Sequence, residues 1–243
     1  MKVAIISDIH GNRQAFEAVL SDIVDESVAE VWCLGDLVGY GADPDACVDL
    51  AREVADVCLA GNHDLAVAGK IPLDDFSRGA AIAVRWTQEV IAPANRDYLA
   101  TLNPAGARAD VGLYHASPRD EVWEYVLSAL LAELCFDATP HRVNLIGHSH
   151  VALSFERFEG RPATGETRRA DSELDLGGGE WLLNPGSVGQ PRDGDPRAAW
   201  LLLDLDRASA RYRRCDYDIP GAASAIRAAH LPDSLAERLE FGQ

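Results

Sequence analysis

Acidic and histidine side chains follow short apolar runs at several points in this sequence. Residues 2–7 are followed by Asp8 and His10, and residues 142–146 are followed by His148 and His150. Five of the seven histidines occupy such places, with two aspartates and one asparagine: Asp8, His10, Asp36, Asn62, His63, His115, His148 and His150. Imidazole, carboxylate and amide ligands without thiolate suit manganese, iron or zinc. Because the set is too large for one tetrahedral ion, we expect two ions, which a carboxylate such as that of Asp36 could bridge.

The apolar runs themselves are typical of buried β-strands. Each contains valine or isoleucine, and helical patterns separate several of them, at residues 2–7, 30–34, 56–60, 110–114 and 142–146. In an open α/β sheet, ligands bind outside the carboxyl ends of the strands, so side chains far apart in sequence can converge there. The neighbouring glycines Gly35, Gly61 and Gly147 would let the backbone turn tightly beside a crowded centre.

Each short motif is weak on its own. An Asp-x-His pair alone is poor evidence for a metal, and Gly-Asn-His-Asp at residues 61–64 could be a turn, since glycine, asparagine and aspartate favour turns. The remaining histidines, His141 and His230, lie outside the strand ends and are expected at the surface. The clustering of ligand types after several strands favours a metal centre, because solvated or core histidines have no reason to gather there.

Helical patterns and further strands fill the rest of the chain. Helices are predicted from the repeat between Phe16 and Val24, from Asp43-Pro44 toward Ala55, over 74–101 with an interruption near Pro93, and over roughly 120–136. After His150, strand-like pieces at 152–158, 180–184 and 198–205 predict a second, more antiparallel sheet, with a hairpin or loop over 160–180. Neither a linker nor a repeat divides the chain, so residues 1–243 are expected to form a single α/β domain.

Composition limits the expected location and partners. Since no run approaches eighteen apolar residues and the N-terminal segment soon meets Asp8, we expect a soluble cytoplasmic protein that does not bind membranes. The five cysteines include no CxxC pair, so reduced, buried thiols are expected. The net charge of −17 argues against long nucleic acid as a partner. The oligomeric state stays open.

The motif blocks, taken in order, resemble those of the calcineurin-like metallophosphoesterases. The matching stretches are Asp8-Ile9-His10, Gly35-Asp36, Gly61-Asn62-His63-Asp64, His115 and Gly147-His148-Ser149-His150. Residues 184–192, Asn-Pro-Gly-Ser-Val-Gly-Gln-Pro-Arg, further resemble a small bacterial and archaeal phosphodiesterase-like subgroup, which extends the match over most of the chain. The resemblance implies an α/β fold, a four-layer αββα sandwich of two mixed β-sheets flanked by helices.

The resemblance also implies a role for each site residue. The first metal would be held by Asp8, His10, Asp36 and His150, and the second by Asn62, His115 and His148 together with the bridging Asp36. His63 would stabilise the phosphoryl transition state or protonate the leaving oxygen, with Asp64 fixing its tautomer. The cofactors would be two divalent transition-metal ions, with manganese as first choice and iron, zinc, cobalt or nickel as alternatives. The implied reaction is in-line attack on phosphorus by a hydroxide that bridges the ions.

The expected substrate is a small phosphodiester or a nucleotide, with dinucleoside polyphosphates among the candidates. Asn12, Arg119 and Arg192 are the candidate substrate-binding residues. Trp123 and Tyr125 could offer aromatic faces to a nucleobase, or they could be ordinary core residues of a helix.

Three other functions are weighed against the same residues. A protein Ser/Thr phosphatase-like phosphomonoesterase would carry an Asp-Arg-Gly run where residues 37–41 read Leu-Val-Gly-Tyr-Gly, and Asn-His-Glu where residues 62–64 read Asn-His-Asp. A non-catalytic scaffold on the same fold would have lost key residues, whereas all seven expected ligands and His63 are present. A dinucleotide-binding oxidoreductase would carry a G-x-G-x-x-G motif after the first strand, which this chain lacks.

Overall fold

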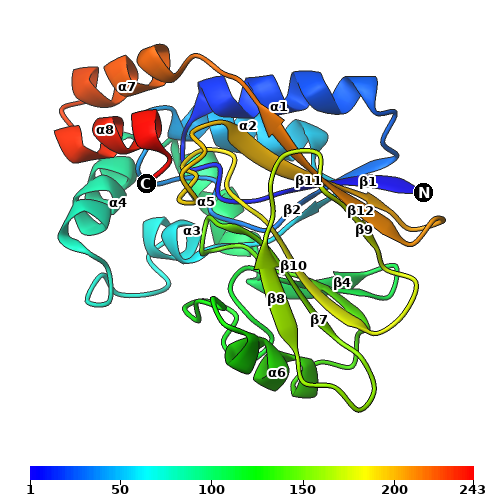
Figure 1. Cartoon of the computed structure of the whole chain (residues 1–243). Helices are drawn as coiled ribbons and strands as arrows, with labels where there is room; N and C mark the ends of the chain where they lie inside the picture. The colour runs from blue at the N-terminus through cyan, green and yellow to red at the C-terminus, as the bar shows by residue number, and fades with distance from the viewer.

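Strand β1 (Lys2–Ile6) shows how an apolar strand builds two buried layers. Val3 and Ile5 pack in the core between two sheets, while Ala4 and Ile6 pack in a core beneath helices, and all four are fully buried. Successive side chains of a strand point to opposite faces, so a strand that is apolar throughout is covered on both sides. The computed structural model, which describes all residues from Met1 to Gln243, repeats this layering across the chain (Figure 1).

Two mixed six-stranded sheets form the centre of the fold. The first contains β1, β2 (Glu30–Cys33), β3 (Val57–Cys58), β9 (Glu173–Asp175), β11 (Ala198–Asp204) and β12 (Ser209–Cys215). The second contains β4 (Ala105–Arg108), β5 (Val111–Tyr114), β6 (Val143–Leu145), β7 (Ala152–Arg157), β8 (Thr164–Thr167) and β10 (Glu180–Pro185). Their strand orders are β3-β2-β1-β11-β12-β9 and β4-β5-β6-β10-β7-β8. Strand β1 pairs in parallel with β2 and antiparallel with β11, so the first sheet contains strands from both the N-terminal and the C-terminal parts of the chain.

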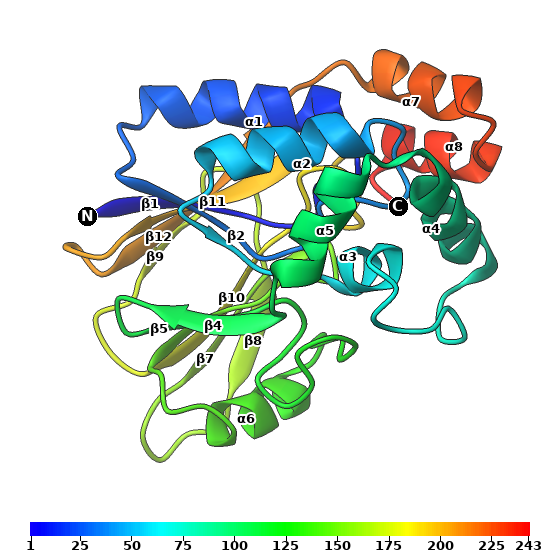
Figure 2. The same cartoon turned by 180° about the vertical axis from the view of Figure 1, so that it is seen from behind.

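Helices cover the outer face of each sheet. Helices α1 (Arg13–Asp25) and α2 (Pro44–Val54) lie over the first sheet, and α6 (Ala129–Asp137) lies over the second (Figure 2). Phe136 of α6 packs against Phe155 and Leu182 of the second sheet, and Trp32 and Leu183 are part of the core between the sheets. This arrangement confirms the predicted four-layer αββα sandwich.

Five further helices gather at one end of the sandwich (Figure 1). They are α3 (Asn62–Val67), α4 (Arg78–Val90), α5 (Pro93–Thr101), α7 (Ile219–Ala228) and α8 (Asp233–Phe241). Helices α4, α7 and α8 share a small apolar core that contains Ala83, Ile226, Leu235 and Leu239, and Tyr40 also packs into it. Because Tyr40 belongs to the chain that leaves β2, this core fixes α8 beside the carboxyl ends of the strands.

The structure corrects the helix predicted over roughly 120–136, which begins only at Ala129. Ser128 Oγ accepts a hydrogen bond from Leu131 N and caps this shorter helix. Before it, Asp120 Oδ1 accepts hydrogen bonds from the backbone N–H groups of Val122 and Trp123. Such local bonds compete with a helix for the same backbone groups, so residues 121–123 form a turn and residues 124–127 have no regular structure.

A second correction concerns the strands after His150, which do not form a separate antiparallel sheet. Strands β7, β8 and β10 join β5 and β6, whereas β11 and β12 complete the first sheet beside β1. The reason is that β1 needs a backbone partner on its free edge, and β11, which is apolar and buried from Ala198 to Leu203, can be covered on both faces there. The predicted hairpin or loop over 160–180 contains β8 and β9.

All five cysteines are free, and four of them are buried, as predicted. Burial raises the pKa of the Cys47 thiol well above its ordinary value, which keeps it in the unreactive protonated form. None of the helices has the length and apolar character that crossing a membrane requires.

Candidate metal centre

The candidate ligands converge at the carboxyl ends of strands from both sheets. They follow β1 (Asp8, His10), β2 (Asp36), β3 (Asn62), β5 (His115) and β6 (His148, His150). Two groups result, one of Asp8, His10, Asp36 and His150 and the other of Asp36, His115 and His148. Within each group the ligand atoms lie within 4.8 Å of one another, and all six residues are buried.

Backbone carbonyls determine the tautomers of three of these histidines. Each Nδ1 atom faces a carbonyl oxygen: His10 with Val38 at 3.0 Å, His115 with Leu34 at 2.9 Å and His150 with Gln190 at 2.7 Å. Because a carbonyl oxygen only accepts, Nδ1 donates, and Nε2 of the neutral ring presents a lone pair. The Nε2 atoms of His10 and His150 nevertheless lie 2.9 Å apart. A cation that both atoms ligate would remove this repulsion.

Asp36 stands between the two groups. Its Oδ2 atom lies 3.5 Å from His10 Nε2 and 3.6 Å from His115 Nε2. Its Oδ1 atom accepts a hydrogen bond from the backbone N–H of His63 at 2.9 Å. Ligand atoms about 2.1 Å from one ion are about 3.0 to 3.4 Å apart in octahedral or tetrahedral geometry. The observed separations are therefore close to those of atoms that share an ion.

The backbone around these ligands is strained and crowded. The residues Asp8, His10, Asp36, His148 and His150 all have φ between 51° and 62°. This left-handed region costs a non-glycine residue roughly 1–2 kcal/mol. A Cβ atom at Gly61 would stand 1.9 Å from Asp36 Oδ1, so only glycine permits this approach, as predicted. Strain concentrated at one cluster indicates that the direction of these side chains matters more than local stability.

Burial shifts the pKa values of the acidic and basic members in opposite directions. It raises the pKa of Asp8 to about 7 and the pKa of Asp36 well above its ordinary value. It lowers the pKa of His10, His148 and His150 well below that of a free imidazole. Each shift disfavours the charged form of the group. Divalent cations would lower the pKa of the carboxyl groups again, because they favour ionised carboxylates, and they bind the neutral imidazoles that burial already favours. The donor set thus fits two divalent transition-metal ions.

The loop after β10 braces the first group. Ser187 Oγ donates a hydrogen bond to the backbone oxygen of Asp8 at 2.8 Å, and Gly189 N donates to the same oxygen at 2.9 Å. His150 is held on two sides, because its ring donates to Gln190 O and its own backbone oxygen accepts from Arg192 N at 3.0 Å. The loop therefore supports the ligands mainly through backbone groups.

His63 lies beside His10, with ring centroids 4.8 Å apart, and its Nδ1 atom is buried without a hydrogen-bond partner. Burial, reinforced by the charge of Arg192, lowers the pKa of His63 to about 3. Asp64 was expected to bond this ring, but it forms no hydrogen bond with it. Its carboxylate accepts hydrogen bonds from the backbone N–H groups of Gly61 and Val38 at 3.0 and 3.2 Å. The carboxylate of Asp64, in the first turn of α3, thus satisfies the free N–H of the N-cap residue Gly61 and a backbone N–H of the loop after β2.

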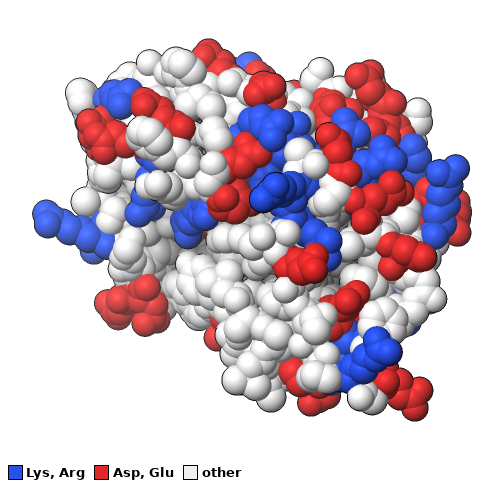
Figure 3. Space-filling model, viewed as in Figure 1, with Lys and Arg blue, Asp and Glu red and all other residues white.

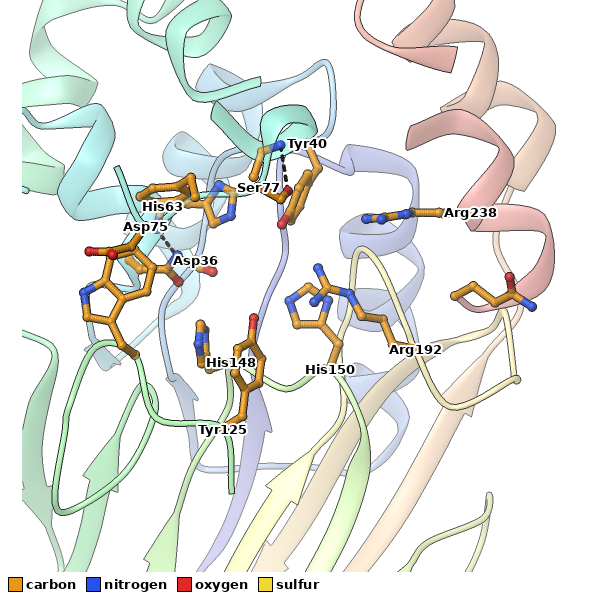
Figure 4. Close-up of a pocket in the computed structure, with 15 residues that line it drawn as sticks. Asp36, Tyr40, His63, Asp75, Ser77, Tyr125, His148, His150, Arg192 and Arg238 are labelled. Carbon is orange, nitrogen blue, oxygen red and sulfur yellow. Dashed lines mark hydrogen bonds between the residues drawn. The ribbon is translucent and has the colours of Figure 1, made fainter. Parts of the chain in front are cut away.

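A cavity of about 290 Å³ lies beside the two groups (Figure 4). Besides Asp36, Asn62, His63, His148 and His150, it is lined by Tyr40, Asp75, Phe76, Ser77, Ala80, Trp123, Tyr125, Arg192, Arg238 and Gln243. In Figure 4, Arg192 and Arg238 lie on one side, and His63 and Asp75 lie on the other. The cavity therefore combines aromatic surfaces and guanidinium groups with the candidate ligands.

Of the three predicted substrate-binding residues, the structure brings only Arg192 to the cavity. The side chain of Asn12 does not line the cavity and is bonded elsewhere, since Oδ1 accepts from Ala15 N and Nδ2 donates to Gly189 O. Arg119 Nη1 forms an ion pair with Glu124 at 3.1 Å and does not line the cavity.

Trp123 and Tyr125 are not helix core residues. Both line the cavity from the irregular segment before α6, and the ring of Tyr125 stacks on His148 with centroids 4.1 Å apart.

Tyr40, Phe76 and Arg238 line the cavity although the sequence did not single them out. Tyr40 lies four residues after Asp36, and this short distance from a ligand was the one feature of the sequence that could have indicated its place in the cavity. Arg238 comes from α8, far from any motif, and nothing in its surrounding sequence indicates a site.

Comparison with known proteins identifies the family. A family model described as the calcineurin-like phosphoesterase superfamily domain matches residues 1–208. The uncharacterised protein MJ0912 of Methanocaldococcus jannaschii is 38% identical over 254 residues, which cover 99% of this chain and 98% of that protein. The crystal structure of a metallophosphoesterase from Sphaerobacter thermophilus has a TM-score of 0.90 and 38% identity, over 100% of this chain and 99% of that one. The hypothetical protein PH1004 from Pyrococcus horikoshii shares the fold with a TM-score of 0.79 and 18% identity, over 100% of this chain and 98% of that one. The chain therefore belongs to the calcineurin-like phosphoesterase superfamily.

Proposed function

We propose that this phosphoesterase hydrolyses a small phosphodiester or nucleotide at a centre of two divalent transition-metal ions. The observation that carries the proposal is the pair of ligand groups that share Asp36. In the first group, the Nε2 lone pairs of His10 and His150 face each other at 2.9 Å. In the second, the Nε2 atom of His148 is buried without a hydrogen-bond partner. One cation at each group would satisfy these atoms.

The proposed ligands are Asp8, His10, Asp36 and His150 for the first ion and Asp36, Asn62, His115 and His148 for the second. Asn62 is included because its Oδ1 atom lies 3.2 Å from His115 Nε2, where two acceptors would otherwise meet. Bound ions of this kind activate water and neutralise the charge of phosphoryl oxygens. Manganese is the first choice, because the donors are oxygen and nitrogen, and iron, zinc, cobalt or nickel would fit the same set.

His63 is the proposed catalytic group for the leaving oxygen. Water adds across the P–O bond in this hydrolysis, so the departing oxygen needs a proton or a hydrogen-bond donor. The ring of His63 lines the cavity, and its backbone is fixed by Asp36 Oδ1. His63 can therefore approach a phosphate at the centre without being a ligand itself.

The shape of the cavity favours a small substrate over a phosphorylated protein. Tyr40, Phe76 and Trp123 line a space of about 290 Å³, and pockets of this size suit small molecules. The partly exposed rings of Phe76 and Trp123 also suit a nucleobase, which keeps dinucleoside polyphosphates among the candidates. We expect the enzyme to act in the cytoplasm.

The direct test compares bis-p-nitrophenyl phosphate with p-nitrophenyl phosphate, using chelated protein with and without added manganese. Diester hydrolysis that requires manganese and is abolished in Asp36→Asn would support the proposal. Hydrolysis of the monoester alone would favour a phosphomonoesterase of the protein phosphatase kind. If the protein binds two ions but cleaves neither ester, the proposed hydrolysis is wrong, and a scaffold role becomes the better explanation.

A further inference from the structure

The cavity has a cationic side whose guanidinium groups are not neutralised by carboxylates. On the face shown in Figure 3, Lys and Arg side chains mostly neighbour Asp and Glu side chains. Arg157, Arg197 and Arg214, for example, each form an ion pair. Arg192 and Arg238 form none, although the chain has 39 acidic residues against 22 basic ones. Their charge is therefore available to a ligand.

Arg192 is held in place by neutral groups. Its Nη2 atom donates a hydrogen bond to Gln190 Oε1 at 2.9 Å, and its guanidinium carbon lies 5.6 Å from the centre of the Tyr40 ring. Its Nε atom is buried and has no hydrogen-bond partner. A buried N–H group without an acceptor is costly, and an oxyanion in the cavity could supply one. Since its backbone N–H is bonded to His150 O, this guanidinium is tied to the first ligand group.

Arg238 reaches the cavity from α8, a helix that packs in the small core with α4 and α7. Leu235 and Leu239 of α8 are buried in the core shared with α4 and α7, and Arg238 lies between them in the same turn, so its backbone has a fixed position. In Figure 4 the guanidinium of Arg238 points toward Tyr40, above Arg192. Helices α7 and α8 lie beyond residue 208, where the match to the family model ends. Arg238 therefore lies outside the segment that the family model matches, whereas all the candidate ligands lie inside it.

The other walls of the cavity are aromatic. Trp123 and Phe76 make an edge contact with ring centroids 5.1 Å apart, and Phe76 makes a similar contact with His63 at 5.1 Å. Besides the candidate ligand Asp36, one acidic side chain, Asp75, lines the cavity, on the side of His63 and away from the arginines. A ligand that combines a planar ring with more than one phosphate would match both kinds of wall.

We propose that Arg192 and Arg238 form a subsite for a second phosphate group, so that the preferred substrates are nucleotides with at least one phosphate beyond the one that is cleaved. The inference rests on the proposed hydrolysis at the metal centre and extends it to substrate choice. Arg192 would contact the phosphate next to the reacting one, and Arg238 would contact the phosphate farther from the ligands. Nucleoside triphosphates and dinucleoside tetraphosphates share this chemistry.

The kinetic test uses Arg238→Gln, Arg192→Gln and the surface control Arg207→Gln. Arg207 suits this purpose because 82% of its side chain is exposed and it does not line the cavity. We measure kcat/KM for ATP, diadenosine tetraphosphate and bis-p-nitrophenyl phosphate in excess manganese. Loss of one charge-assisted contact should lower the ratio of nucleotide to bis-ester activity about tenfold in Arg238→Gln and should leave the ratio unchanged in Arg207→Gln. Equal ratios in all variants would overturn the subsite.

A binding measurement separates this inference from the proposed hydrolysis. Titration calorimetry with β,γ-methylene ATP and with AMP does not depend on turnover. We expect Kd for the triphosphate analogue to rise at least fivefold in Arg238→Gln, with a smaller rise for AMP and recovery in Arg238→Lys. If the wild type cleaves no ester but this pattern holds, the subsite stands and the hydrolysis fails. If both ligands weaken equally, the second-phosphate subsite is wrong.

Discussion

Gly39 lies directly against the ring of His63, and a Cβ atom at Gly39 would stand 2.2 Å from His63 Nδ1. This glycine has φ +87°, and it belongs to the Leu-Val-Gly-Tyr-Gly run that follows Asp36. The absence of a side chain is thus what lets the ring of His63 sit where it does. The Nδ1 atom, on this side of the ring, is buried and has no hydrogen-bond partner.

Replacing Gly39 by alanine should displace His63 without removing any ligand. We expect kcat to fall at least tenfold while the manganese content of the protein stays the same, because a misplaced donor to the leaving oxygen slows the chemical step. Metal analysis and steady-state kinetics on one preparation would check this. Gly194→Ala is the matched control, since its φ is +82° and no atom lies within 4 Å of the added carbon. Both variants should lose some stability, but Gly194→Ala should keep its kcat.

Removal of the His63 imidazole should abolish most turnover and spare the metals. We expect His63→Ala to bind two manganese ions per chain and to lose roughly 10²- to 10⁴-fold in kcat, the usual range for general acid–base groups. His141→Ala provides a control in which a histidine outside the site is removed. If His63→Ala lost metal along with activity, His63 would have to be counted among the ligands.

The stability of the metal-free protein should depend on pH through Asp8. Because burial raises the pKa of Asp8 to about 7, the folded metal-free state holds this proton more tightly than the unfolded chain. The carboxyl therefore destabilises the folded state increasingly as the pH rises from about 4 to about 7, by about 1.4 kcal/mol per unit of pKa shift. In chelator, Asp8→Asn should raise Tm relative to the wild type, and this difference should grow over that pH range.

With manganese present, the sign of the Asp8→Asn effect should reverse. The charged carboxylate then serves as a ligand, and its removal should lower Tm at pH 8. Thermal unfolding of both proteins at pH 4.5 and 8, with chelator and with manganese, gives the four differences in Tm that are needed. A variant that is no more stable than the wild type in chelator at pH 8 would contradict the predicted cost of the buried charge.

The ligands and the layered fold could be predicted from sequence because both depend on local patterns. Apolar runs such as residues 2–6 must be covered on both faces, and the residues that follow them lie at one edge of a sheet whichever way the strands are ordered. Asp8 and His148 could therefore be grouped although 140 positions separate them.

Features that depend on long-range packing could not be predicted in this way. The pairing of β11 with β1 is a choice among free strand edges, which the residues of β11 alone do not encode. Asp64 was expected beside the His63 ring, but the backbone N–H groups of Gly61 and Val38 compete for its carboxylate. Arg238 reaches the cavity only because α8 packs against α4 and α7.

The most direct measurement is the number of manganese ions bound per chain, determined by titration calorimetry and elemental analysis of chelated protein. The wild type should bind two ions, and Asp36→Asn should bind at most one with comparable affinity, because Asp36 is common to both ligand groups. Asp137→Asn, a change in a carboxylate of α6 remote from the centre, should bind two. A wild type that binds no ion, or an Asp36→Asn protein that binds two as tightly as the wild type, would contradict a centre of two ions that share Asp36.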